Sequence, residues 1–553
     1  MLLAAGTAAF AQSEPNLEVG FKPYGSYHGS EIDTVSLMNG NLTLHIPFLG
    51  HYPQRGGRLD SQSLLAMNSK TWTLQVPEGA CQGADCLPFW NLNAGWTPAA
   101  LASGDTLQPK IGRTYQVDSD GQGNLSFSAW GYFITGWDGM RHDLMDVSNG
   151  SLTALEAVDA SGWRINMNAS GSVPATGTLL DGQGNQYQIR FSTPALAGPY
   201  AHSPVCSTTT DPTPVSNGDA APLLTLTPDF TSQCSQAAEV VSVTDGNGNL
   251  YQFTGATDTL GRLYSTAATF SPTTDLSGCV SASSLSSPAT ITTYPGPNGT
   301  VNPVKTCFAL VNVHTNFGVS GTREWPIQSG GSQTLVPVTI ILPDGTKWIF
   351  SYDSYGNVTS VGLPLGGTVT YQWATVAFPN VGVTPVSRVV MQRTITDNLG
   401  HSGIWNYRWM TQQSNPAQLN GTYSNIVTDP NGNDTVHVFT NTLGGFYETS
   451  SLSYQGLSAN GQLLKRVDTT YSVTGVGGAS LQPWITVLPT SIRTTLGPGG
   501  KVSLVQKTYD TALSDPQRRH QLRQSPDGKG LRLGPECAGR IAAGNRYHLS
   551  VAA

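Results

Sequence analysis

Charged residues are scarce in this sequence. Asp, Glu, Lys and Arg together make up 11% of its 553 residues, whereas soluble domains average about 25%. Ser, Thr, Asn, Gln and 62 glycines stand in their place, and these residues suit turns and solvated strand faces better than helices. The composition therefore predicts an all-β fold, and a hydrophobic content of 38% is enough to fill a core.

A basic stripe and a long apolar segment are both missing. The chain has 28 basic and 35 acidic residues, a net charge of −7, and no stripe of Lys and Arg with interleaved aromatics. Nucleic acid is therefore not expected as a partner. Beyond the N-terminus no run approaches the roughly 18 apolar residues that a transmembrane helix needs, so we expect no membrane span.

Recognisable catalytic and metal-binding motifs are missing too. The sequence lacks G-x-S-x-G, H-E-x-x-H and the glycine-rich phosphate loops, and its closest histidine pair, His45 and His51, flanks Pro47 instead of following helical spacing. The loop D-S-D-G-Q-G-N at 118–124 offers oxygen ligands for calcium but lacks the closing Glu of an EF-hand. Paired glycosidase carboxylates cannot be recognised from spacing. We expect a non-enzymatic protein with no catalytic residue, cofactor or metal site.

The first residues have the form of a secretory leader. A short apolar run, residues 1–11, ends in Ala9-Phe10-Ala11, the small-x-small pattern that signal peptidases accept. The basic n-region of a typical leader is missing, so a hydrophobic N-terminal tail is the alternative. We expect residues 1–11 to be a signal peptide and the protein to be secreted or held at the cell surface.

Seven cysteines fall into three close pairs and one single residue. The pairs are Cys81 with Cys86, Cys206 with Cys234 and Cys279 with Cys307, and Cys537 stands alone. A zinc site is disfavoured, because the sequence has no second closely spaced pair of Cys or His residues that could complete four zinc ligands with Cys81 and Cys86. We therefore predict a disulfide in each pair and an oxidising compartment, with unrelated buried thiols as the alternative.

A short turn motif recurs along the chain. The segment S-Y-D-S-Y-G-N-V-T-S at 351–360 contains Tyr352, Asp353, Gly356 and Asn357. An Asp can bond its own backbone two residues on and a Gly can take positive φ, so this segment predicts two strands joined by a tight turn. The frame of Asp, two variable residues, Gly and a polar residue returns in looser form, beginning at Asp181, Asp245, Asp397 and Asp429. Its irregular spacing indicates a degenerate array of hairpins.

The residues near these turns alternate with a period of two. Aromatic side chains occupy one face of each expected strand, namely Trp348, Phe350 and Tyr352 in one and Trp405, Tyr407 and Trp409 in another. Such strands bury one face and leave the other solvated. A carbohydrate-binding platform would share this pattern, but aromatic rows within a sheet more often form core. We expect these side chains to be buried.

The turn motif resembles a repeat unit of a known family. Y-D-S-Y-G-N-V-T-S is similar to a unit of the YD-repeat, or Rhs, proteins, and the segments 40–59 and 67–72 resemble the region that opens many of them. The resemblance implies the N-terminal portion of a large secreted bacterial chain whose repeats wind into a β-sheet shell, with a variable effector downstream. One departure is D-P-N-G-N at 429–433, where Asn433 replaces the Leu of the family's D-P-x-G-L motif.

Four segments follow from these observations. They are a signal peptide (1–11), an N-terminal β-domain (12–235), a YD-repeat-like antiparallel β-sheet region (236–515) and a basic tail (516–553). The tail holds seven basic and two acidic side chains and lacks the aromatic alternation found upstream. We expect it to be disordered or the product of a frameshift, with a basic interaction segment as the alternative.

Two functions are compatible with these features. The first is a β-shell fragment that encloses or presents an effector encoded downstream, or that contacts a neighbouring cell surface. The second is a secreted carbohydrate-binding or carbohydrate-active protein, suggested by tryptophans that gather between residues 70 and 165: Trp72, Trp90, Trp96, Trp130, Trp137 and Trp163. A row of exposed rings near paired carboxylates would favour carbohydrate.

Overall fold

The fold is described from a computed structural model. The described ranges are 15–53, 59–76, 87–93, 95–97, 104–105, 109–119, 125–147, 153–168, 175–191, 205–207, 232–253, 257–261, 269–283, 288–295, 300–327, 333–378, 384–442, 445–476, 484–497, 499–509 and 546–551. Within them the chain forms 35 strands and one helical segment, the short 3-10 helix η1 (Pro15–Leu17). The predicted all-β fold is confirmed.

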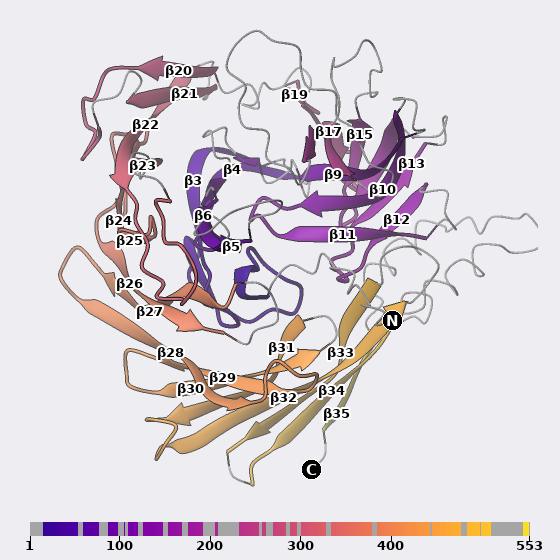
Figure 1. The fold of residues 1–553 in the computed structure, drawn as a ribbon, viewed down its shortest axis with the longest axis vertical. Coiled ribbons are helices and arrows are strands. Elements are labelled where there is room, and N and C mark those ends of the chain that lie inside the picture. The colour runs from indigo at the N-terminus through magenta and orange to yellow at the C-terminus, as the bar shows by residue number, and fades with distance from the viewer. Residues whose placement is uncertain are drawn as a thin grey trace, which may run out of the picture.

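Sixteen strands form one large antiparallel sheet. They are β20 (Thr269–Thr273), β21 (Ala289–Pro295), β22 (Val301–Asn312), β23 (Gln333–Ile341), β24 (Lys347–Tyr352), β25 (Val358–Gly362), β26 (Thr368–Ala377), β27 (Val386–Thr396), β28 (Ser402–Ser414), β29 (Thr422–Thr428), β30 (Asp434–Thr442), β31 (Gly445–Gln455), β32 (Gln462–Val476), β33 (Trp484–Leu496), β34 (Val502–Thr508) and β35 (Arg546–Val551). Each strand pairs with the next one in sequence. The sheet curls from β20 round to β35, and its concave side faces the N-terminal strands (Figure 1).

A second sheet is formed by strands that lie between residues 110 and 258. Its strands are β9 (Lys110–Ser119), β10 (Leu125–Thr135), β11 (Arg141–Asp146), β12 (Ala154–Ala157), β13 (Arg164–Met167), β14 (Thr176–Leu180), β15 (Gln186–Phe191), β16 (Val205–Ser207), β17 (Ser232–Thr244), β18 (Leu250–Gln252) and β19 (Thr257–Asp258). β15 pairs with both β14 and β17, which closes β9 to β15 and β17 into a ring of eight strands. A ring of this size has an interior that side chains can fill, and Tyr132, Ile165 and Leu179 are buried in it.

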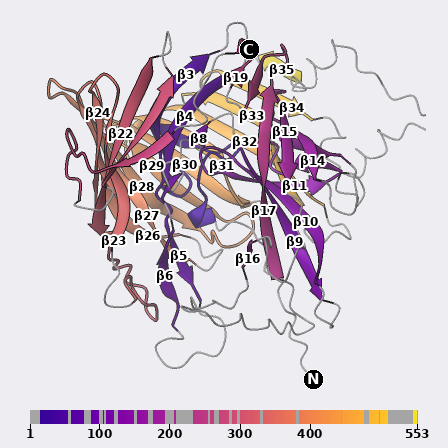
Figure 2. The same ribbon diagram turned by 90° about the horizontal axis from the view of Figure 1, so that it is seen from above.

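The N-terminal strands form two small sheets. The larger has the order β1-β2-β3-β4-β7 with β8 also beside β4, and its strands are β1 (Tyr27–Gly29), β2 (Asp33–Ser36), β3 (Leu42–Pro53), β4 (Asp60–Asn68), β7 (Trp96–Thr97) and β8 (Gly104–Asp105). The smaller pairs β5 (Trp72–Gln75) with β6 (Phe89–Leu92). Figure 2 shows β3 and β4 between the large sheet and the ring.

The main core lies between the N-terminal sheet and the concave face of the large sheet. Val35, Leu42 and Leu44 are fully buried on the N-terminal side. Apolar side chains of the large sheet pack against them, including Trp348, Phe350, Tyr407, Tyr423 and Phe439, with Tyr352, Trp405 and Trp409 partly buried around them. The aromatic alternation seen in the sequence is therefore core packing.

The sheets do not divide at the expected domain boundary. Residue 235 lies inside β17. This strand pairs with β9 and β15 and so belongs to the ring. The change from the ring to the large sheet falls between β19 and β20. Strand pairing does not test whether the parts fold separately, so the division into domains stays a prediction. The expected signal peptide lies outside the described residues.

The basic tail contributes one described strand. β35 pairs antiparallel with β34, from Ser503 opposite Val551 to Thr508 opposite Arg546. The expectation of disorder or a frameshift in the rest of the tail stays a prediction, but residues 546–551 form a strand. The reason is a period-two pattern, Tyr547, Leu549 and Val551, that suits an added strand. Residues 510–545 lie outside the described ranges.

No helix in the described part of the chain is long and apolar enough to cross a membrane. The one helical segment there, η1, is three residues long, whereas a spanning helix needs about 20.

Candidate functional site

One carboxylate organises the repeat turn between β24 and β25. Asp353 Oδ1 accepts hydrogen bonds from the backbone N–H groups of Tyr355 (2.9 Å) and Asn357 (2.8 Å), and Oδ2 accepts one from the Asn357 side-chain amide (3.2 Å). The Gly356 N–H donates to the Asp353 carbonyl at 3.1 Å. Gly356 has a φ of 78°, a backbone conformation that favours glycine.

Two side chains tie this turn to the rest of the sheet. Arg388 of β27 donates to Asp353 Oδ2 at 3.0 Å, and its guanidinium lies 4.1 Å from the centre of the Tyr355 ring. The Tyr352 hydroxyl donates to the Pro337 carbonyl of β23 at 2.6 Å. These contacts assign the turn residues a structural role.

The same geometry recurs in four other predicted turns. In each, the carboxylate accepts hydrogen bonds from the backbone N–H groups two and four residues on, and the side chain four residues on also contacts it; these turns begin at Asp181, Asp245, Asp397 and Asp429. The glycine three residues on has a φ from 80° to 90° in all four. The motif is therefore a hairpin-closing unit shared by the ring and the large sheet.

The alanine variant of Asp353 tests this unit. Asp353→Ala should lower the free energy of unfolding by about 1.5 to 3 kcal/mol, because hydrogen bonds to a charged group are lost and the Arg388 guanidinium loses its partner. The matched control is Asp397→Ala, which removes the same backbone contacts from a turn whose partner His401 is largely exposed. We expect a smaller loss there. Urea unfolding compares them, and equal losses would contradict the contribution of Arg388.

A buried ion pair joins the N-terminal sheet to the concave face of the large sheet. Arg393 of β27 donates to both oxygens of Asp33 in β2, with a distance of 2.7 Å to Oδ1. Tyr371 donates to Oδ2 at 2.8 Å, and Ser30 donates to Oδ1. Asp33 is fully buried and Arg393 is 2% exposed. Burial alone would raise the pKa of Asp33, but the hydrogen bonds and charge of Arg393 hold it below its ordinary value.

The turn after β2 is held through its backbone. Asn425 and Tyr423 of β29 donate to the carbonyls of Leu37 and Met38, each at 2.8 Å. Gly40 in this turn has a φ of 69°, and a Cβ there would lie 2.6 Å from Val389 of β27. The turn therefore packs so closely on the large sheet that only glycine fits.

A buried lysine makes a further link. Lys70 follows β4, and its Nζ donates to the Ser387 hydroxyl at 2.6 Å and to the Arg388 carbonyl at 2.8 Å. Burial, together with the charge of Arg388, lowers the pKa of Lys70 well below its ordinary value. These contacts hold residues 15–53 and 59–70, here named the N-terminal segment, against the inner face of the large sheet.

Two histidines lie at the same interface. His28 Nδ1 is 2.7 Å from the Tyr407 hydroxyl, and His437 Nδ1 is 3.2 Å from Glu448 Oε1. The hydroxyl of Ser26, in the N-terminal segment, donates a hydrogen bond to the other oxygen of Glu448. The inner face thus contacts the N-terminal segment through titratable groups as well as aromatic rings.

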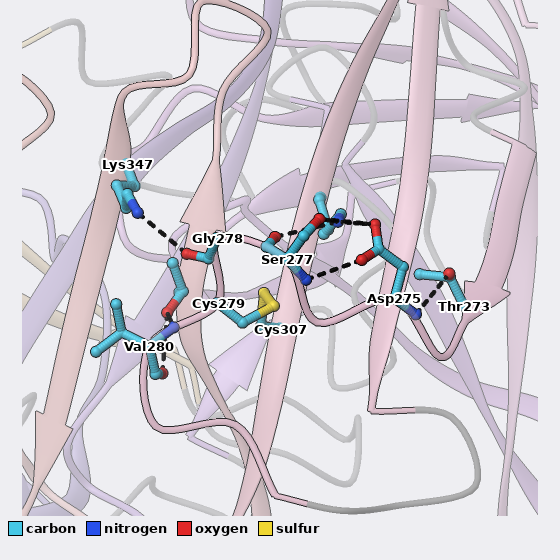
Figure 3. The surroundings of a disulfide bond; sticks show 10 residues. Thr273, Asp275, Ser277, Gly278, Cys279, Val280, Cys307 and Lys347 are labelled. Atoms are coloured by element: carbon cyan, nitrogen blue, oxygen red, sulfur yellow. Dashed lines mark hydrogen bonds and ion pairs between the residues drawn. A yellow bond between two sulfur atoms is a disulfide. The ribbon is translucent and has the colours of Figure 1, made fainter.

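A disulfide fastens a loop to the outer face of the large sheet. Residues 274–283, here named the strap, connect β20 towards β21, and Cys279 in the strap is bonded to Cys307 of β22 with Cα atoms 5.9 Å apart (Figure 3). Thr306 pairs with Ile340, which belongs to the main core on the inner face. Because neighbouring residues of a strand face opposite sides, Cys307 lies on the outer face. This is the pairing expected from the spacing of these two cysteines.

Polar contacts spread the strap over three strands. Lys305 of β22 donates to the Ser277 carbonyl at 3.2 Å and Lys347 of β24 donates to the Gly278 carbonyl at 3.1 Å. Thr339 of β23 exchanges two hydrogen bonds with the backbone of Val280, at 2.9 and 3.1 Å (Figure 3). Beneath the strap a small apolar cluster is buried, made of Cys307, Ala309, Val336 and Val338.

The other predicted cysteine pairs stay predictions. Cys206 and Cys234 are directly opposite each other where β16 pairs with β17, and opposite Cα atoms in antiparallel strands are about 4.5 to 5.5 Å apart, within disulfide range. Their side chains are not described. Cys81, Cys86 and Cys537 lie outside the described residues.

The tryptophans that suggested a carbohydrate platform mostly fill cores. Trp72 is 4%, Trp90 0% and Trp96 8% exposed, and Trp90 stacks on Phe317 with ring centroids 3.9 Å apart. Trp137 and Trp163 are half-buried, and the Trp130 side chain is not described. The five described rings form no exposed row.

Metal-ligating side chains do not gather in the described part of the chain, where no three His, Cys, Asp or Glu residues could hold a metal ion together. His45 lies between the rings of Phe21 and Trp137, with centroids 5.1 and 5.0 Å away. Of the calcium-like loop at 118–124, residues 120–124 lie outside the described ranges.

The charged residues of the interface, Asp33, Arg393 and Lys70, belong to no motif in the sequence that predicts their role. Asp33 is the first residue of β2, and Arg393 interrupts the apolar series Val389, Val390 and Ile395. In a chain with so few charges, an ionisable residue inside an apolar strand signals a buried partner. The identity of that partner depends on the tertiary fold.

Comparisons with known proteins complete the description. No protein-family model matches the sequence, and a search of curated proteins finds no similar sequence. Two crystal structures are similar at 10% and 9% identity, those of TcdB2-TccC3-TEV and TcdB2-TccC3-Cdc42, covering 85% and 89% of this chain with TM-scores of 0.12 and 0.13. The chain spans 38% and 25% of their lengths. TM-scores this low carry no argument about fold or function.

Proposed function

We propose that this chain is a non-enzymatic structural protein, a portion of a YD-repeat β-shell that is secreted or displayed at a cell surface and that encloses or presents an effector polypeptide. The observation that carries the proposal is the large sheet, in which sixteen consecutive strands curl with their aromatic face inward. The recurring Asp-x-x-Gly turns that join its strands are those on which the family resemblance depends.

The inner face suits the enclosure of polypeptide. It already binds one segment of chain, the N-terminal segment, through aromatic rings, side chains that donate to backbone carbonyls and an ion pair. Contacts to backbone carbonyls are available to any sequence, so a surface of this kind can hold unrelated polypeptides. Neighbouring cell surfaces remain partners to be tested by binding.

Carbohydrate binding receives no support from a specific feature. The tryptophans on which that function depended are buried or half-buried, and those that are described make packing contacts with other side chains. We therefore keep the shell as the proposed function.

A secretion and protection experiment tests the proposal. A protease-sensitive, unfolded polypeptide is appended after Ala553, and the full chain is produced in a secreting bacterial host. We expect to find the chain and its cargo outside the cytoplasm, and thiol mapping should show that Cys279 and Cys307 are oxidised. The appended cargo should be cleaved more slowly than the same polypeptide added as a separate chain.

A matched variant lacks residues 1–11. This variant should stay in the cytoplasm with reduced thiols, because that compartment keeps cysteines reduced. Equal cleavage of appended and separate cargo would refute enclosure, and an unchanged location of the variant would refute the signal peptide.

A further inference from the structure

His28 lies at the centre of the contact between the N-terminal segment and the large sheet. Its ring packs against those of Trp405 and Tyr407, with centroids 6.0 and 5.7 Å away, and Nδ1 is 2.7 Å from the Tyr407 hydroxyl. A neutral imidazole nitrogen can accept the hydroxyl proton, whereas a protonated imidazole has only donors. When the neutral ring accepts this hydrogen bond through Nδ1, protonation of His28 requires the Tyr407 hydroxyl to turn its proton away.

Charges from three strands face His28. Burial lowers its pKa most, Arg393 of β27 and His437 of β30 lower it further, and Asp33 of β2 acts in the opposite direction. Tyr407 of β28 is its hydrogen-bond partner and stays uncharged, since burial raises its pKa. An added positive charge on His28 would lie near the permanent charge of Arg393.

The nearby carboxylates cannot readily balance that added charge. Asp33 is already occupied by four hydrogen bonds from three side chains. Glu448 accepts a hydrogen bond from Ser26 and contacts His437. A protonated His28 would thus lie in a half-buried interface with no carboxylate of its own.

The direction of the pH effect follows from this environment. The folded protein binds a proton at His28 less readily than the unfolded chain does, since the pKa of His28 is lowered on folding. Stability from such a group is present above the ordinary histidine pKa of about 6.5 and is lost as the pH falls below it. Acid therefore weakens the contact between β1 and the large sheet.

We propose that His28 makes the N-terminal segment an acid-released latch on the inner face of the large sheet. In mild acid, positive charge on His28 adds to that of Arg393 across one interface. β1 and β2 then separate from β27, β28 and β30, while the antiparallel pairing within the large sheet persists. Release uncovers the aromatic lining that the N-terminal segment covers at neutral pH.

Hydrogen exchange of the full chain tests the latch. At about pH 5.5 compared with about pH 7.5, after correction for intrinsic exchange rates, peptides spanning residues 27–36 should lose protection several-fold. The ring is the internal reference. There, burial alone would lower the pKa of His142, but the hydrogen bond and charge of Asp159 raise it, so acid does not weaken that contact.

The His28→Gln variant assigns the effect. Glutamine keeps a hydrogen-bonding group for Tyr407 but does not titrate, so the loss of protection in acid should disappear. The matched control is His401→Gln, at an exposed turn of the large sheet, which should retain the full response. A response that persists in His28→Gln belongs to another group, such as His45, and overturns the proposal.

A measurement on the unaltered protein keeps the test decisive if His28→Gln does not fold. Nuclear magnetic resonance of isotope-labelled histidine side chains should show His28 titrating below free histidine, together with the loss of protection at residues 27–36. Titration of His28 at or above the value of free histidine would overturn the latch.

Discussion

Replacement of Arg393 with methionine should lower the free energy of unfolding by about 3 to 5 kcal/mol, as expected when one partner of a buried ion pair is removed. Methionine fills similar space, but it leaves the fully buried Asp33 carboxylate without a counter-charge. The pair also joins two parts of the chain that are 360 positions apart. We therefore expect both a lower urea midpoint and faster exchange in β2.

Two variants control for this result. Arg466→Met removes a pair with Asp468 whose side chains are 51% and 34% exposed, and its effect should stay within about 0.5 kcal/mol. The double variant Asp33→Leu, Arg393→Met removes both buried charges and should recover part of the loss. An Arg393→Met variant as stable as the Arg466→Met variant would show that the buried pair does not hold the N-terminal segment.

Removal of the Cys279–Cys307 disulfide should cost about 3 to 4 kcal/mol on the chain-entropy estimate for its loop, which has a sequence separation of 28. The variant is Cys279→Ser with Cys307→Ser, so that neither partner of this disulfide is left as an unpaired thiol. The loss should be concentrated at the edge of the large sheet, because the strap crosses β22, β23 and β24. Differential scanning calorimetry and exchange at residues 274–283 measure the two effects.

The unaltered protein in a reductant provides the control. Within residues 274–283, reduction should reproduce the exchange of the double serine variant, because both open the Cys279–Cys307 link. A further control, Lys305→Met, keeps the disulfide but removes the contacts of Lys305 with Asp275 and Ser277, and we expect a smaller loss of protection in the strap. If the double serine variant, the reduced protein and the Lys305→Met variant all exchange at residues 274–283 as the oxidised, unaltered protein does, the strap is held without the disulfide.

Features that depend on neighbouring residues could be predicted from the sequence. The Asp353 turn is predictable because the hydrogen bonds that close it to the backbone of Tyr355 and to Asn357 lie within five residues. The burial of Trp348 and Phe350 is predictable because alternation along one strand selects one face. These local rules also explain why the fold class is confirmed.

Features that depend on distant residues could not be predicted. Nothing near Asp33 indicates Arg393, and nothing near Tyr187 indicates that β15 pairs with β17 opposite Val243 to close the ring. The position of residue 235 inside β17 could not be predicted for the same reason, because β17 pairs with β9 and β15, which lie much earlier in the chain. The interface around the N-terminal segment is therefore the part of the structure that the sequence left undetermined.

The separation of Asp33 and Arg393 along the chain also has a consequence for biosynthesis. A ribosome adds roughly 5 to 20 residues per second, so the 360 positions between these residues correspond to roughly 20 to 70 seconds of elongation. During that interval Val35, Leu42 and Leu44 are already synthesised, whereas Tyr407, Tyr423 and Phe439 of the same core are not. The core between the N-terminal sheet and the large sheet can therefore be completed only late in synthesis, and until then part of the apolar surface of the N-terminal segment stays exposed.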